Sequence, residues 1–168
     1  MNMKEINIKE LNFNPFEKIG KQWFLITAGD ENSWNTMTAS WGFMGVMWGK
    51  NCLQAVVRPS RHTYSFLEKN EYFTASFLPE EYRSALMFCG RNSGRDCDKS
   101  KETGLTPVFV DGTAAIEQAE LVLVCRKLYV QEMKPEFFTD EALKAENING
   151  DPMHTEFISE IVKVYVKD

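Results

Sequence analysis

Alternating apolar and polar positions along the chain predict a fold made mainly of short β-strands. Runs rich in Val, Ile, Phe and Thr, bounded by Gly, Asn, Asp or Pro, are typical of antiparallel sheets. Residues 29–35, between two such runs, have the composition of a loop. We predict strands over residues 23–28, 36–42, 52–58, 72–77, 108–116, 121–133 and 158–168.

Two of these runs predict finer detail. Asp111-Gly112 divides its run into a tight hairpin, because both residue types tolerate a positive φ. In the last run, Val162, Val164 and Val166 alternate with Lys and Tyr residues. Since side chains in a strand point alternately to its two faces, this pattern predicts that the three valines face the core.

Two helices are predicted between the strands, over residues 61–69 and 79–90. Apolar residues of the second recur three and four positions apart, as on one face of a helix. Ser60 is the expected N-cap of the first helix and Asn70 its end, and Gly90 is the residue type that commonly follows a helix. Many short strands with few helices predict an α+β fold, a β-barrel decorated with helices, rather than a βαβ array.

Length and charge set bounds on the function. A chain of 168 residues fits one domain, and we treat residues 1–168 as a single unit. With 19 basic and 24 acidic residues the formal charge is −5, which argues against a nucleic-acid binder but leaves room for a local basic pocket. No apolar run approaches the roughly 18 residues that span a membrane, and the N-terminal residues do not resemble a secretory signal. We therefore expect a cytoplasmic protein with no membrane partner.

The four cysteines show no metal-ligating spacing, and with only two histidines in the chain we predict no metal site. Cys52 and Cys125 are expected to be reduced thiols that pack as small apolar side chains. A thiol-redox role for Cys89 and Cys97 is an alternative, although the sequence places no activating histidine near them.

One segment combines a strand end, a turn and a helix start. Arg58 ends the strand, Pro59 stiffens the turn, and Ser60, Arg61 and Thr63 surround the first helical turn. A helix N-terminus has unpaired N–H groups and a partial positive charge, so these residues suit a phosphate monoester. The alternative is a capped helix with solvated arginines.

The loop over residues 89–101 is a second candidate anion site, because its basic side chains and backbone N–H groups can wrap an anion. In the alternative interpretation it is a polar surface loop whose bases pair with Asp96 and Asp98. It is not a Walker A loop, and no GxGxxG dinucleotide motif occurs in the chain. The basic residues of the loop are Arg91, Arg95, Lys99 and Lys101.

A third feature is residues 35–50, where hydroxyls at every second position lead into Trp, Met and Gly residues. The hydroxyls and backbone of an exposed strand can hydrogen-bond the polar edge of a planar ring, while the large side chains cover its apolar part. The alternative is a strand and turn whose aromatic side chains fill the core. Together the three features suit a flat heteroaromatic ring with a phosphate tail, which is the shape of FMN.

With these motifs in this order, the sequence resembles the flavin reductase-like family, and within it the flavoredoxin-type branch. The resemblance covers almost the whole chain, and the combination is specific although each piece alone is not. It implies the FMN-binding split β-barrel fold and a homodimer that holds FMN near the subunit interface. The segments that carry it are residues 35–42, 57–70, 73–77, 81–99, 104–107 and 121–129.

The resemblance also implies which residues contact FMN. The first segment would line the ring, the turn and helix start would meet the ribityl phosphate, and the loop would close over either part. Around His154 and Phe157 the chain departs from the family pattern, so no site residue is predicted there. The expected cofactor-binding residues are Asn35, Thr36, Met37, Thr38, Ala39, Ser40, Trp41, Arg58, Pro59, Ser60, Arg61, Thr63, Ser76, Phe77, Cys89, Gly90 and Lys99.

The activity implied by the resemblance is that of an NAD(P)H-dependent FMN oxidoreductase. Hydride passes to flavin N5, and electrons then pass to a small-molecule or protein acceptor. This needs no catalytic side chain, and Thr38, Ser40 and Lys99 are candidates for tuning the flavin potential. Two alternatives stay open: a non-enzymatic FMN electron-transfer protein like flavoredoxin, and a split-barrel module that binds haem or pyridoxal phosphate.

Overall fold

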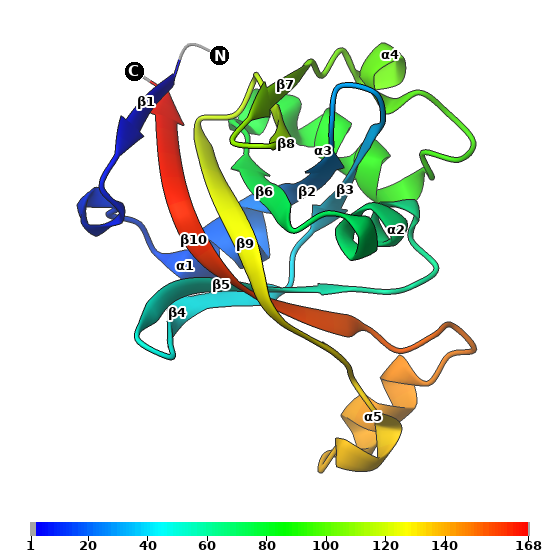
Figure 1. Ribbon diagram of the computed structural model, residues 1–168. Helices are drawn as coiled ribbons and strands as arrows, with labels where there is room; N and C mark the ends of the chain where they lie inside the picture. The colour runs from blue at the N-terminus through cyan, green and yellow to red at the C-terminus, as the bar shows by residue number, and fades with distance from the viewer. Residues whose placement is uncertain (1–2, 168) are drawn as a thin grey trace.

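An antiparallel sheet organises the chain, and the computed structural model describes residues 3–167 of it (Figure 1). Eight strands form one sheet in the order β3-β2-β6-β9-β10-β5-β4, with β1 also paired to β10, while β7 and β8 form a separate hairpin. This confirms the predicted α+β class. The strands are β1 (Met3–Ile6), β2 (Phe24–Gly29), β3 (Trp34–Ala39), β4 (Gly42–Met47), β5 (Lys50–Val57), β6 (Tyr72–Phe77), β7 (Pro107–Val110), β8 (Thr113–Ile116), β9 (Leu121–Glu132) and β10 (Thr155–Lys167).

Short helices fill the connections. In Figure 1, α2, α3 and α4 lie around β3, and α5 projects away from the barrel. The helical segments are η1 (Ile8–Glu10), α1 (Pro15–Glu17), η2 (Lys18–Gln22), α2 (His62–Lys69), η3 (Glu80–Tyr82), α3 (Arg83–Arg91), α4 (Lys99–Thr103), η4 (Pro135–Phe137) and α5 (Glu141–Asn147).

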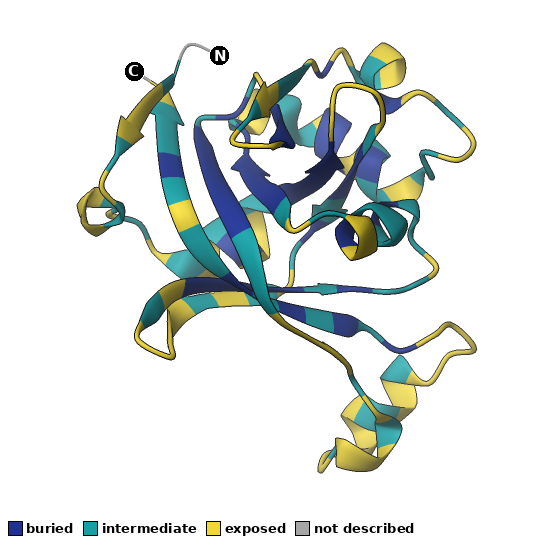
Figure 2. Ribbon diagram, viewed as in Figure 1, coloured by how far each residue is buried: buried dark blue, intermediate teal, exposed yellow. Residues whose placement is uncertain are grey.

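The core lies against the central strands β2, β6 and β9, which are the most buried part of the sheet (Figure 2). Phe24 and Phe77 stack there with ring centroids 5.2 Å apart. Cys52 and Cys125 are buried as predicted. The Asp111-Gly112 hairpin is also confirmed, with φ values of 47° and 79°.

The last strand differs from its prediction. β10 begins at Thr155, and residue 168 lies outside the described residues. Val164 is buried, but Val162 is 39% exposed, so the prediction that it faces the core is wrong. The register between β10 and β9 shifts between Ile161 and Lys163, and such a bulge turns the extra side chain off the regular alternation.

Both predicted helices exist, but their ends differ. The N-cap of α2 is Arg61, not Ser60, and no side chain caps it, whereas Asn70 is the C-cap as expected. The second segment starts as a single 3₁₀ turn before α3. Gly90 lies inside α3, which ends at the C-cap Asn92, so its predicted role as the residue that follows the helix is wrong.

The predicted strand over residues 36–42 is shorter at its end, because β3 stops at Ala39 and a turn leads into β4. Gly42 has φ +148°, and a Cβ there would lie 2.3 Å from the carbonyl oxygen of Gln54. Only glycine fits this backbone approach. β3 is the first strand in the sheet order. Among the described residues it pairs only with β2, so its other edge is free.

Candidate functional site

Two adjoining cavities lie along the free edge of β3. The inner cavity has a volume of about 50 Å³ and the edge cavity about 440 Å³, and Met37, Ser60 and Arg61 line both. The inner cavity is completed by Asn35, His62, Thr63, Cys89, Asn92, Ser93, Gly94 and Lys99. The edge cavity is completed by Thr38, Ala39, Ser40, Trp41, Val56, Arg58, Asp151 and His154.

The backbone of β3 turns some of its N–H and C=O groups toward these cavities and away from the sheet. The Thr36 carbonyl accepts a hydrogen bond from Lys99 Nζ at 2.7 Å, so the backbone groups of Thr36 point away from β2. Residues in an antiparallel strand alternate in this respect, and Thr38 therefore also directs its N–H and C=O to the free edge. The edge strand can hydrogen-bond a ligand through its main chain.

The threonine hydroxyls of β3 already make hydrogen bonds within the protein, which leaves them to a ligand mainly as acceptors. Thr36 Oγ1 lies 2.8 Å from Thr27 Oγ1, inside the sheet. Thr38 Oγ1 donates to the carbonyl of Leu86 in α3 at 2.5 Å. The sequence pattern predicted the strand that borders the cavities. In the structure the threonine hydroxyls bind β3 to its neighbours, whereas its backbone faces the cavities.

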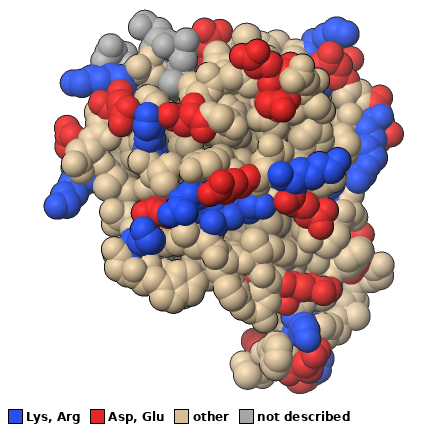
Figure 3. Space-filling view, viewed as in Figure 1, with Lys and Arg blue, Asp and Glu red and all other residues tan. Residues whose placement is uncertain are grey.

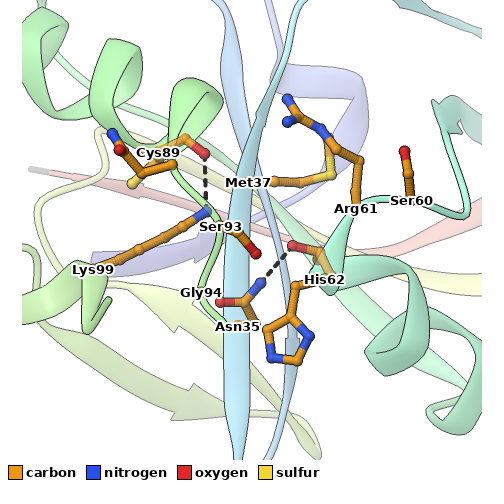
Figure 4. Close-up of a pocket in the computed structure, with 11 residues that line it drawn as sticks. Asn35, Met37, Ser60, Arg61, His62, Cys89, Ser93, Gly94 and Lys99 are labelled. Carbon is orange, nitrogen blue, oxygen red and sulfur yellow. Dashed lines mark hydrogen bonds between the residues drawn. The ribbon is translucent and has the colours of Figure 1, made fainter. Parts of the chain in front are cut away.

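Three cationic side chains line the cavities, Arg95 lies beside them, and all four hydrogen-bond neutral carbonyls. Lys99 is only 6% exposed and donates to Cys89 at 2.9 Å as well as to β3 (Figure 4). Arg61 donates to Gly90 at 2.6 Å, Arg95 to Ser60 at 3.0 Å, and Arg58 to Pro152 at 2.7 Å. Within residues 3–167 none of the four makes an ion pair. Their positive charge is therefore held in place without being neutralised.

The pKa values of the two histidines are lowered in part by this positive charge. Burial, then Arg58, lowers the pKa of His154 to about 4, although Asp151 opposes the effect. Burial, then Arg95 and Lys99, also lowers the pKa of His62. Both imidazoles are therefore neutral at pH 7, and an anion in the cavities would meet a favourable field.

The start of α2 adds hydrogen-bond donors to the inner cavity. The first turn of a helix has N–H groups without intrahelical acceptors, and here the N-cap side chain does not satisfy them. His62 Nδ1 is buried and has no hydrogen-bond partner among the described residues. The backbone N–H groups of this turn fit a phosphate group, which the predicted segment was expected to bind.

Loop 92–98 closes the inner cavity against β3. Asn35 Nδ2 donates to Thr63 Oγ1 at 2.8 Å and so joins β3 to α2. A Cβ at Gly94 would lie 2.1 Å from Asn35 Oδ1 and 3.2 Å from His62. The loop can come this close only because residue 94 is glycine.

Comparison with known proteins gives this arrangement a family. A family model described as a flavin reductase like domain matches residues 16–168. The chain belongs to the flavin reductase-like family. The resemblance predicted from the motifs is thus confirmed. No curated protein sequence matches the chain significantly.

Solved structures show the same fold for this flavin reductase-like chain, all at low identity. Flavoredoxin from Methanosarcina acetivorans is 21% identical over 98% of this chain and 76% of its own, with a TM-score of 0.70. An FMN-binding protein from Thermus thermophilus with bound p-hydroxybenzaldehyde is 22% identical over 86% and 71%, with a TM-score of 0.66. An NADH:FAD oxidoreductase from Streptomyces globisporus is 16% identical over 85% and 74%, with a TM-score of 0.64. The predicted split β-barrel fold is confirmed.

Some predicted site residues of the flavin reductase-like domain lie away from the cavities. Ser76 and Phe77 are fully buried, and β6 pairs with β2 on one side and β9 on the other. A central strand has no free edge, so these two residues belong to the core. Pro59 shapes the turn without lining either cavity, whereas Cys89, Gly90 and Lys99 all lie beside the cavities.

Other residues of the site were missed. His154 lines the edge cavity and packs on Trp41 with ring centroids 5.3 Å apart. The sequence around His154 departs from the family pattern, so no role was predicted for it, although it is one of two histidines in the chain. His62 and Gly94 stood within the predicted segments, but only the folded chain shows that they meet.

Two further observations concern the other predictions. Burial raises the pKa of the Cys89 thiol to about 11, so it stays protonated at pH 7 and is a poor nucleophile.

In residues 3–167 no helix is long and apolar enough to cross a membrane. The cytoplasmic location stays a prediction.

Proposed function

We propose that this protein is an FMN-binding oxidoreductase that takes electrons from NAD(P)H and passes them to an acceptor. The observation that carries the proposal is the set of three cations without ion pairs, Arg58, Arg61 and Lys99, that line two cavities at the free edge of β3. A dianionic phosphate compensates such charge, and a planar ring with hydrogen-bonding edges suits a strand edge.

Each part of FMN has residues that suit it. The inner cavity, with Arg61, Lys99 and the start of α2, would hold the phosphate. The edge cavity, with the backbone of β3 and the ring of Trp41, would hold the isoalloxazine ring. Trp41 is 58% exposed, so its ring is free to cover a ligand.

When bound, FMN supplies the redox chemistry, and the protein supplies binding and orientation. The carbonyls that Lys99 and Arg61 engage fix these cations before a ligand arrives, so little side-chain entropy is lost on binding.

A homodimer is part of the proposal. The β4–β5 hairpin exposes apolar side chains, with Phe43 70%, Val46 73% and Trp48 61% exposed. Figure 3 shows that the surface over this hairpin carries few charged residues, below a band of alternating charges. Exposed apolar patches of this kind mark protein interfaces, and a second copy of the chain is the partner we propose.

Two structural relatives support a small-molecule acceptor and a pyridine-nucleotide donor. The Thermus thermophilus protein holds p-hydroxybenzaldehyde, and the Streptomyces globisporus protein is an NADH:FAD oxidoreductase. The flavoredoxin of Methanosarcina acetivorans has the same fold and represents the alternative, a carrier that only exchanges electrons with other proteins.

The test is a visible absorption spectrum of the purified protein, with and without added FMN, followed by anaerobic addition of NADH and NADPH. A bound flavin spectrum that bleaches with either nucleotide supports the oxidoreductase. A bound flavin that bleaches with dithionite but with neither nucleotide indicates the electron carrier. Protein that takes up no FMN at micromolar concentration refutes both.

A further inference from the structure

A third cavity adjoins the edge cavity. It has a volume of about 740 Å³, within the range of small-molecule sites. Ser40, Trp41, Val56 and His154 line both cavities, so this apolar cavity opens beside the proposed ring position. Its other walls come from segments far apart in the chain: residues 15–20, β4, and residues 133–153 before β10.

The lining of the apolar cavity differs in kind from that of its neighbour. Its walls hold no Lys, Arg, Asp or Glu, and their largest members are aromatic or methionine side chains. Aromatic rings stack on other rings, and methionine sulfur makes favourable contacts with them. The side chains of this group are Phe16, Trp41, Phe43, Phe138, Met44, Met133 and Met153.

A few polar groups stand at the cavity walls. The Gln54 side chain is 8% exposed, and its Oε1 has no hydrogen-bond partner among the described residues, while Nε2 donates to Glu156 at 3.2 Å. The His154 imidazole is neutral at pH 7, so it adds a hydrogen-bonding group without adding charge. A small number of polar groups on apolar walls is the usual design of a site that orients an uncharged ligand.

We propose that the apolar cavity binds an uncharged aromatic molecule of the quinone class, which is the electron acceptor of this protein. Its role as acceptor rests on the function proposed above, whereas its binding does not. A quinone that lies there gains a hydride from the reduced flavin and a proton from solvent. It leaves as the hydroquinone, and the flavin returns to its oxidised state.

The charge pattern separates acceptor from donor. A pyridine nucleotide carries a diphosphate, and burying it among uncharged walls without a cation is unfavourable. An uncharged ring loses no such hydration and gains apolar burial. The competing occupant is the partner subunit of the proposed homodimer, whose own apolar residues would fill the same space.

The test uses two matched ligands, 2-hydroxymethylanthraquinone and anthraquinone-2-sulfonate, in calorimetric titrations of FMN-loaded protein. Both rings lack a thiol-reactive position, and only one is charged. We expect the uncharged ligand to bind about tenfold or more tightly than the sulfonate. Equal affinities, or no binding of the uncharged ligand to protein that binds FMN, would overturn the proposal.

Two neighbouring phenylalanines outside the β4–β5 hairpin locate the site. Phe138 lines the cavity, whereas Phe137 does not line it and is 70% exposed. We expect Phe138→Glu to weaken the uncharged ligand about tenfold and to leave FMN affinity unchanged, and Phe137→Glu to alter neither. If Phe43→Glu, in the proposed dimer interface, loses the ligand and dissociates the dimer in sedimentation while Phe138→Glu keeps the ligand, a second copy closes the cavity and the proposal fails.

Repeating the titration without FMN separates this proposal from the proposed function. If the protein binds the uncharged ring but no FMN, the cavity stands as a binding site and the acceptor role falls. If it binds FMN but not the ring, the proposed function stands and the proposal for the apolar cavity fails.

Discussion

The edge cavity and the apolar cavity share Trp41 and His154, yet they differ in almost every physical respect. The edge cavity and its inner extension collect cations that hydrogen-bond only to carbonyls. The apolar cavity has no formally charged wall at neutral pH. One barrel thus places a cavity suited to an anion beside a cavity suited to an uncharged ring, and Ser40, Trp41, Val56 and His154 line both.

Keeping the charged Lys99 side chain buried in the inner cavity costs free energy. Lys99 is buried without a carboxylate, and burial lowers its pKa. Taking a charge out of water is unfavourable unless hydrogen bonds and an opposite charge compensate it. The carbonyls supply the hydrogen bonds, and a ligand with a phosphate would supply the charge. Ligand binding should therefore also raise the stability of the fold.

The largest expected effect follows from removing one cation of the inner cavity. Arg61→Ala should weaken FMN binding by about 1.5–3 kcal/mol, the scale of a hydrogen bond to a charged group. This corresponds to roughly a 10- to 150-fold higher dissociation constant. Riboflavin lacks the phosphate, so its affinity should barely change. Fluorescence titration with both flavins measures the difference.

Arg83 is the matched control for this substitution. It too donates to main-chain carbonyls, those of Lys21 and Gln22, and its guanidinium stacks on Trp23 at 3.5 Å. It lines neither cavity of the site. Arg83→Ala should leave both flavin affinities unchanged in the folded protein. Equal losses of FMN and riboflavin with Arg61→Ala would mean that the arginine only supports the structure.

The next effect concerns how closely loop 92–98 approaches β3. Gly94→Ala places a methyl group 2.1 Å from Asn35 Oδ1, and the Asn35 side chain is 7% exposed with its amide held by Thr63. Overpacking of this kind should lower the free energy of unfolding by about 1–2 kcal/mol. Urea denaturation measures it.

Gly90→Ala is the matched comparison, because a Cβ there meets Thr38 no closer than 3.4 Å. Alanine is also favoured over glycine inside a helix by roughly 0.5–1 kcal/mol. This variant should be as stable as the parent or more so. If the two substitutions have the same effect, the loop is not fitted to β3 as the structure has it.

The sequence predicted features that depend on neighbouring residues. The Asp111-Gly112 hairpin follows from backbone preferences of two adjacent residues, and it is confirmed. The burial of Cys52 and Cys125 follows from residue type and the runs around them. The grouping of Arg58, Ser60 and Arg61 at one site was predicted because the three residues belong to one short segment, and they do line the cavities together.

Features that depend on distant contacts were not predictable in this way. Val162 faces solvent because the register of β10 against β9 shifts, which no local pattern encodes. Ser76 and Phe77 were placed near the flavin by resemblance, but the position of β6 in the middle of the sheet buries them. The apolar cavity joins segments as distant in the chain as residues 15–20 and residues 133–154, so its uncharged lining is visible only in the fold.

The smallest expected effect concerns His154, which lines both cavities, and the dependence of the free energy of unfolding on pH. The pKa of His154 falls from an ordinary 6.5 to about 4 in the folded protein. Between these values the unfolded chain binds a proton that the folded chain does not, so stability is complete above pH 6.5 and falls as the pH drops towards 4. The full displacement corresponds to about 3 kcal/mol, which solvent screening of this half-buried group reduces to about 1 kcal/mol. In His154→Asn, the difference in unfolding free energy between pH 7 and pH 4.5 should shrink by that amount.

The same measurement with FMN distinguishes the two histidines. The pKa of His62 is lowered by burial and then by Arg95 and Lys99, of which Lys99 lines the inner cavity. A bound phosphate would offset these cations and raise that pKa, so His62 should lose its contribution to acid sensitivity when FMN is present. His154 lies at the apolar boundary and should keep most of its own. An NMR titration of the two imidazoles follows both directly, and equal upward shifts with FMN would show that the phosphate lies between them and that the inner cavity does not hold it.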